Sequence, residues 1–120
     1  MPKHAAKTTL CLCLLALALS AASALAGSRL EARAGYRLPV LKTAYCLRGR
    51  TRSGGYVHPG SIAVDPRLIP LGSRLFVPGY GWGRAEDTGS AVLGHHIDVW
   101  MASCADALRA TAQVTVTVYR

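Results

Sequence analysis

Acidic residues are scarce in this sequence. Asp and Glu total 6 of 120 residues against 14 Lys and Arg, which gives a net charge of +8 at neutral pH. Such a charge favours anionic partners, for example cell-wall polymers, lipid head groups or nucleic acid. The arginines are scattered along the chain and no nucleic-acid-binding motif is present, so we expect no nucleic acid partner.

Several motifs that would indicate a cofactor or a common catalytic class are also missing. No C-x-x-C pair and no Ser-His-Asp nucleophile elbow is present. The glycine-rich run at 79–83 is not followed by a helical pattern, so it does not indicate a phosphate-binding loop. His58, His95 and His96 lack the spacing of zinc ligands. We therefore expect neither a metal nor a cofactor.

Residues 1–26 have the anatomy of a signal peptide. Lys3 and Lys7 precede the apolar run at 10–19, and the run ends before an A-x-A cleavage signal at 24–26. The alternative is an uncleaved membrane anchor, but the apolar run is shorter than the roughly 20 residues that a span needs. We expect cleavage after Ala26 and export to the periplasm or cell envelope.

The chain beyond the signal peptide contains two cysteines, Cys46 and Cys104. An even number of cysteines in an exported protein suggests one disulfide, although two unrelated buried thiols are the alternative. A bond between them would close a loop of about 60 residues and add roughly 3–4 kcal/mol of stability on the chain-entropy model.

The sequence after residue 26 divides into two parts. Residues 27–42 are mixed, polar and glycine-bearing, which predicts a leader or linker. In residues 43–120, short strand-like runs alternate with turns, one helix is expected at 103–111 behind an N-cap at Ser103, and the last run alternates Val with Thr and Tyr. The pattern predicts a small, closed or nearly closed β-structure.

Asp98 stands in the middle of the strand-like run HHIDVW. An ionised aspartate that faces an apolar interior is costly, but period-2 geometry puts Asp98 on one face with His96 and Trp100. Ile97 and Val99 occupy the other face. A carboxylate, an imidazole and an indole on one face suit a sugar-binding groove.

The other acids have simpler interpretations. Glu86 and Asp87 are strand neighbours and point to opposite faces, so one of them can face the groove. Asp65 precedes Pro66, where structural Asx turns are common.

Three stretches resemble the 3D domain, a family named for three aspartates: residues 43–55, residues 61–90, and HHIDVW with SCADAL. The family is similar to the catalytic barrel of MltA-type lytic transglycosylases. By motif, the three aspartates fall on Asp65 in AVDP, Asp87 in AEDTG and Asp98 in HIDVW. The resemblance implies a mainly-β fold, a small six-stranded double-psi β-barrel with one short helix.

The resemblance also implies an activity. Lytic transglycosylases cut the β-1,4 bond between N-acetylmuramic acid and N-acetylglucosamine and leave a 1,6-anhydro end. Asp98 corresponds to the acid/base, and Asp87 to a partner that orients substrate or raises the pKa of Asp98 by repulsion. The supporting and substrate-binding positions are Asp65, Thr88, Gly89, Tyr80, Trp82 and Trp100.

The sequence departs from the family pattern in two places. Gly89 is followed by Ser90 where the family has a second glycine, and residues 93–96 read LGHH where the family has a Lys-Gly-Asn-Arg run. MltA-type enzymes also have a second domain that forms the far wall of the cleft, a role that another cell-wall protein could fill. The alternative function is a non-catalytic, expansin-like barrel that binds wall polysaccharide through Tyr56, Tyr80, Trp82 and Trp100.

Overall fold

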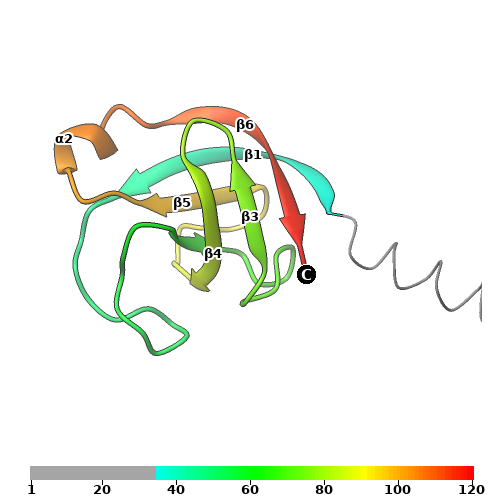
Figure 1. Cartoon of the computed structure of the whole chain (residues 1–120), viewed down its shortest axis with the longest axis horizontal. Coiled ribbons are helices and arrows are strands. Elements are labelled where there is room, and N and C mark those ends of the chain that lie inside the picture. Colours follow the sequence, from blue (N-terminus) through cyan, green and yellow to red (C-terminus); the bar gives the residue numbers. More distant parts are fainter. Residues whose placement is uncertain (1–34) are drawn as a thin grey trace, which may run out of the picture. The chain divides into compact units, whose positions relative to one another are not determined.

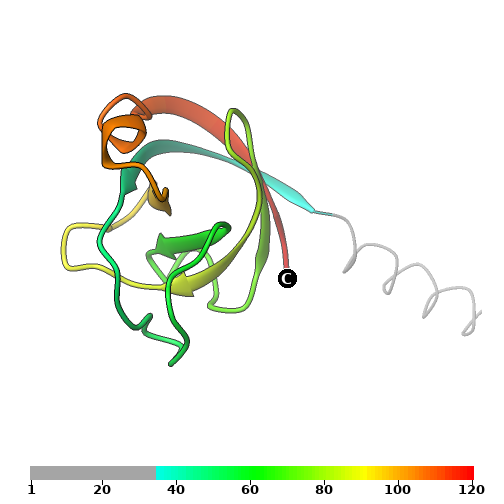
Figure 2. The same ribbon diagram turned by 60° about the vertical axis from the view of Figure 1, so that its left-hand side comes forward.

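Six strands close into a barrel in the computed structural model, which describes residues 35–120 (Figures 1 and 2). Around the barrel the strands follow the order β1-β5-β2-β4-β3-β6, with parallel pairs β1–β5 and β2–β4 and antiparallel pairs elsewhere. The predicted mainly-β, six-stranded barrel with one short helix is confirmed. The elements are β1 (Tyr36–Tyr45), β2 (Ser61–Val64), β3 (Arg74–Val77), β4 (Gly81–Asp87), β5 (His96–Trp100), α2 (Cys104–Ala107) and β6 (Ala112–Tyr119).

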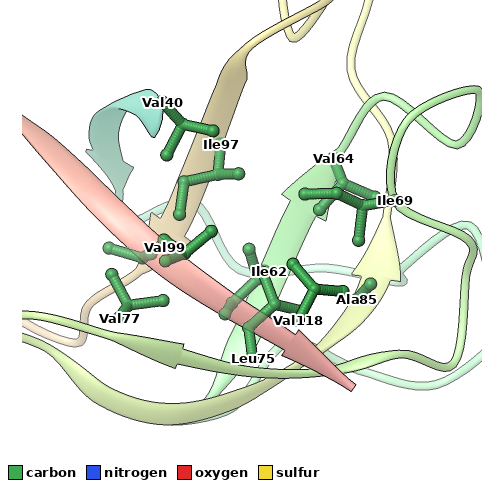
Figure 3. Close-up of a cluster of buried hydrophobic side chains, with 11 residues drawn as sticks. Val40, Ile62, Val64, Ile69, Leu75, Val77, Ala85, Ile97, Val99 and Val118 are labelled. Atoms are coloured by element: carbon green, nitrogen blue, oxygen red, sulfur yellow. The ribbon is translucent and has the colours of Figure 1, made fainter. Parts of the chain in front are cut away.

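The barrel interior is filled by aliphatic side chains from all six strands. Because successive strand residues point to opposite faces, every second residue contributes to this core. Val116 and Val118 of β6 are fully buried, as the Val/Thr alternation predicted. Figure 3 shows Ile62, Leu75 and Val118 gathered in one cluster and Val64 packed beside Ile69.

β1 begins earlier than the sequence predicted. Its first residues, 36–42, fall inside the segment 27–42 that was predicted to be a leader, and they pair with β6. The leader was predicted from the mixed, polar composition of the segment, which also contains Pro39, a residue with no N–H for a ladder. At Pro39 the strand pairs with β6 alone, since pairing with β5 starts only at Leu41, so proline is tolerated there.

α2 is a single turn and is shorter than the predicted helix at 103–111. The predicted N-cap is present, because the Ser103 hydroxyl accepts a hydrogen bond from the Asp106 amide at 3.2 Å. Ala107 is the one buried residue of the helix and Leu108 is exposed, so little apolar area supports further turns.

The predicted disulfide is confirmed. Cys46 and Cys104 are bonded across 58 residues and join the end of β1 to the start of α2. Disulfides persist in oxidising environments, so the bond suggests an extracellular or cell-envelope protein.

The predicted signal peptide, residues 1–26, and residues 27–34 lie outside the described residues. In the described part of the chain, no helix has both the length and the apolar character to cross a membrane.

We predict that replacing both cysteines, Cys46→Ser with Cys104→Ser, lowers the free energy of unfolding by about 4 kcal/mol. The bond closes a 58-residue loop, and opening it restores that loop entropy to the unfolded chain. Urea unfolding of the oxidised wild type and the double variant measures the difference. Equal unfolding midpoints would show that the bond contributes nothing to stability.

Candidate functional site

The two central aspartates lie in one row that crosses four strands of the barrel. Asp98 of β5 pairs with Thr43 of β1 on one side and with Ala63 of β2 on the other. Ala63 pairs in turn with Asp87 of β4. The row therefore reads Thr43, Asp98, Ala63, Asp87, with a single small residue between the two acids.

This row lies on the outer face of the barrel. Ile62 and Val64 beside Ala63, and Ile97 and Val99 beside Asp98, are fully buried in the core. Alternation therefore turns Ala63 and Asp98 outward. The methyl group of Ala63, which is 4% exposed, is the one side chain that stands between the two acids in this row.

An irregularity in the ladder brings Asp87 into the row. The register between β2 and β4 shifts between Ile62 and Ala63, as at a β-bulge, so that Asp87 rather than Glu86 stands opposite Ala63. Glu86 instead accepts hydrogen bonds from the Ser61 hydroxyl at 3.0 Å and lies 2.9 Å from His58 Nε2. The sequence left open which of the two acids faces the site, and the bulge places Asp87 in the row with Asp98.

Asp98 is half-buried and has one side-chain donor. The Thr43 hydroxyl lies 2.9 Å from Asp98 Oδ1, and His96 Nε2 lies 2.8 Å from the same hydroxyl. Burial raises the pKa of Asp98, against the opposing effects of the Thr43 hydrogen bond and the His96 charge. Repulsion from Asp87, which was an expected source of this shift, is not among its causes.

Asp87 has a different environment. Its Oδ1 accepts hydrogen bonds from the backbone amides of Arg52 and Thr88, both at 2.9 Å. Arg52 belongs to the long loop between β1 and β2, which extends beyond the barrel (Figure 1). Gly89 continues from Thr88 into a turn in which the Val92 amide donates to its carbonyl. The two acids thus have separate hydrogen-bond partners.

Tyr45 is a site residue that the sequence interpretation missed. Its hydroxyl is buried and has no hydrogen-bond partner in the described part of the chain. Burial raises the Tyr45 pKa, and the charges of Asp87 and then Asp98 raise it further, so the phenol lies near both carboxylates and stays neutral. Thr43 and Tyr45 alternate on β1, so the period-2 rule that was applied to HHIDVW would have placed both on the site face.

Asp65 is structural in this arrangement. It is 2% exposed at the end of β2 and forms an ion pair with Arg67. Backbone amides of Arg67 and Gly94 donate to its two oxygens at 3.0 and 2.8 Å. These contacts, led by the Arg67 guanidinium, hold the Asp65 pKa well below its usual range. The carboxylate therefore ties β2 to the loop that leads into β5.

The aromatic candidates separate into two groups. The Tyr80 hydroxyl donates to the Trp100 carbonyl and accepts from the Gly60 amide, both at 2.8 Å. Trp100 is 4% exposed, and its Nε1 donates to the Leu47 carbonyl at 3.0 Å. Tyr80 and Trp100 thus both form hydrogen bonds to the long loop between β1 and β2. Trp82, in contrast, is 52% exposed.

Trp82 stands between two hollows that do not include Asp98. One hollow of about 480 Å³ is lined by Tyr80, Trp82 and Trp100, and another of about 230 Å³ by His58, Trp82 and Glu86. Arg74 lies over the indole at 4.7 Å, and Phe76 meets it edge-on with 5.4 Å between ring centres. The surface thus offers an aromatic platform in addition to the aspartate row.

Within residues 35–120, no three His, Cys, Asp or Glu side chains lie close enough together to hold a metal ion. Each of the three histidines in this range contacts another residue of the protein. His58 contacts Glu86, His95 Nδ1 lies 2.8 Å from the Pro39 carbonyl, and His96 contacts Thr43.

A family model of the 3D domain matches residues 60–120. This chain belongs to the 3D domain family. The match includes Asp65, Asp87 and Asp98, and it confirms the resemblance drawn from the motifs.

Two curated relatives from Bacillus subtilis (strain 168) align with part of the 3D domain protein. The cell wall-binding protein YocH is 56% identical over 46 residues, which is 38% of this chain and 16% of YocH. The putative cell wall shaping protein YabE is 54% identical over 48 residues, which is 40% of this chain and 12% of YabE. The chain thus spans less than a fifth of the length of these relatives.

The Streptomyces papain inhibitor is a solved structure with a similar fold. It superposes with a TM-score of 0.57 at 19% identity and covers 72% of this chain and 97% of its own. At this identity the likeness shows the fold alone, and it supports the barrel architecture.

We predict opposite effects on stability for two Asp→Asn changes. Asp98 has a raised pKa, so the folded state binds its proton more tightly and loses stability as pH rises above the ordinary value of 3.8. Asp98→Asn should therefore raise the free energy of unfolding at pH 7 and change it little near pH 3. Asp65 has a lowered pKa, so its contribution is present above 3.8 and fades as pH falls below it. Asp65→Asn should therefore destabilise the protein at pH 7.

Urea unfolding of the wild type, Asp98→Asn and Asp65→Asn at pH 3 and pH 7 tests both predictions. A less stable Asp98→Asn variant at pH 7 would mean that the ionised carboxylate is well accommodated in the fold, which would contradict a raised pKa of Asp98.

Proposed function

We propose that this protein is exported to the cell envelope and cleaves the glycan strands of peptidoglycan as a lytic transglycosylase, with Asp98 as its acid/base. The observation that carries the proposal is the environment of Asp98, a half-buried carboxyl whose raised pKa favours the protonated form. A glycosidic oxygen needs a proton from such a group as its bond breaks.

One carboxyl can perform both proton transfers of this reaction. Asp98 gives its proton to the leaving oxygen as the bond to C1 breaks. The C6 hydroxyl of the same sugar then attacks C1, and its proton returns to Asp98, so no water needs activation on the far face. Hydrolysis with two carboxylates would require a second acid as nucleophile or base. Two backbone amides donate to Asp87, and its strand pairing places it next to Ala63. This fixed position suits Asp87 to orient the substrate.

The relatives support the cell wall as the location of the substrate. One is named a cell wall-binding protein and the other a putative cell wall shaping protein. The family match covers β2, β4 and β5, which carry Ala63, Asp87 and Asp98, and the basic charge of the chain suits an anionic wall. The aspartate row lies on an outer face of the barrel, so another cell-wall protein could complete the cleft.

A second candidate function is wall binding without cleavage, and the exposed Trp82 favours it. An indole that is open to solvent, braced by Arg74 and Phe76 and flanked by two hollows, is suited to stack on a sugar ring. On this view the barrel holds polysaccharide as expansin-like domains do, and the aspartates only shape the surface.

Mass spectrometry of a peptidoglycan digest tests the first proposal. The wild-type protein should release 1,6-anhydro-muropeptides, and Asp98→Asn should reduce their yield by at least about 100-fold because the proton donor is lost. The variant is expected to be at least as stable as the wild type at pH 7, so unfolding would not explain the loss. Products with reducing ends would instead indicate a hydrolase.

Sedimentation with insoluble wall separates the two candidates. Trp82→Ala should weaken binding whichever candidate holds, while Leu108→Ala, which removes an exposed apolar side chain that lines neither hollow, should leave it unchanged. Binding that survives Asp98→Asn, with no soluble fragments from the wild type, would support the non-catalytic function and end the catalytic one.

A further inference from the structure

The hydroxyl of Thr43 has two titratable neighbours. Asp98 Oδ1 lies 2.9 Å from it, and His96 Nε2 lies 2.8 Å from it. A third contact, to the Ile97 carbonyl, is longer at 3.3 Å. A hydroxyl has one proton to donate and can also accept. If it donates to one of the two titratable groups, it can only accept from the other.

The second nitrogen of His96 removes an ambiguity. His96 Nδ1 lies 3.0 Å from the Ala91 carbonyl, and a carbonyl oxygen can only accept a hydrogen bond. Nδ1 must therefore carry a proton whenever this bond is made. Any change in the charge of His96 then has to occur at Nε2, the atom that faces Thr43.

We propose that Asp98, Thr43 and His96 form a relay that holds one mobile proton in two interchangeable arrangements. In the first, protonated Asp98 donates to Thr43, and Thr43 donates to the bare Nε2 of a neutral His96. In the second, the imidazolium of His96 donates to Thr43, and Thr43 donates to the Asp98 carboxylate. Both arrangements satisfy every partner and contain the same number of protons.

The surroundings of the relay leave these three side chains coupled mainly to one another. Tyr45 from β1 and Asp87 from β4 are the other titratable groups near the carboxyl, and neither is among the causes of the raised pKa of Asp98. β2 presents Ala63 to Asp98, while Asp65 at its end is paired with Arg67. On either side of the relay, His95 bonds to the Pro39 carbonyl and Lys42 lies on the opposite face of β1.

The catalytic role of the relay rests on the proposed function. Within that function, the relay stabilises Asp98 between its two proton transfers. When Asp98 has given its proton to the leaving oxygen, the Thr43 hydroxyl can turn from His96 to the new carboxylate and stabilise it. The proton that arrives from the C6 hydroxyl restores the starting arrangement. Thr43 and His96 act through Asp98 and are positioning residues, with no requirement that either touches the sugar.

Nitrogen-15 NMR of the His96 ring tests the relay without any measurement of activity. In the wild type, neutral His96 should carry its proton on Nδ1, which is the less common tautomer of histidine. Thr43→Val removes the hydroxyl that faces Nε2, and Asp98→Asn removes the carboxyl that shares the relay proton, so each should shift the Nε2 resonance from its wild-type position at the same pH. Thr43→Ser keeps the hydroxyl and should behave as the wild type does.

His95 serves as the control in the same spectra, because it bonds to Pro39 and not to the relay. Its signals should not change between the variants. A neutral His96 with its proton on Nε2, or an Nε2 resonance unchanged in both Thr43→Val and Asp98→Asn, would overturn the relay. If Thr43→Val does not fold, the wild-type tautomer and the Nε2 resonance of Asp98→Asn still decide. A confirmed relay in a protein that releases no wall fragments would reject the proposed function alone.

Discussion

The functional account depends on the partial burial of one carboxyl group on the outer surface of a small barrel. An exposed aspartate gives up its proton far below neutral pH, and a fully buried one could not reach a substrate. The alternation of β5 places Asp98 between these extremes. Its neighbours Ile97 and Val99 point into the core. The Asp98 side chain points outward and lies in a row with residues of the adjacent strands β1 and β2. The fold thus raises the proton affinity of Asp98 and still leaves it accessible.

Crosslinks outside the row hold its members in place. The Cys46–Cys104 bond follows directly after Tyr45, and the Met101 amide donates to the Tyr45 carbonyl. Trp100 anchors the start of the long loop through the Leu47 carbonyl, and further along the loop the Arg52 amide reaches Asp87. These bonds therefore contribute both to stability and to the geometry of the site, because they fix the ends of β1 and β5.

Much of this arrangement could be read from the sequence. The period-2 pattern placed His96, Asp98 and Trp100 on one face, and the two cysteines beyond residue 26 predicted their bond. The bulge that selects Asp87 over Glu86 could not be read, because it depends on how β2 and β4 pair across the barrel. The strand around Pro39 was missed for a similar reason, since local propensity does not show that only one neighbouring strand is present there. Thr43 and Tyr45 were overlooked although their alternation was visible.

The central claim is that Asp98 retains its proton at a pH at which an ordinary aspartate has lost it. The most direct test is carbon-13 NMR titration of the Asp98 carboxyl, with the Asp98→Asn spectrum used to assign its signal. The account predicts a midpoint clearly above the ordinary value of 3.8, and a further rise when a peptidoglycan fragment is bound and excludes water. A midpoint at or below 3.8 in both the free and the bound protein would contradict it.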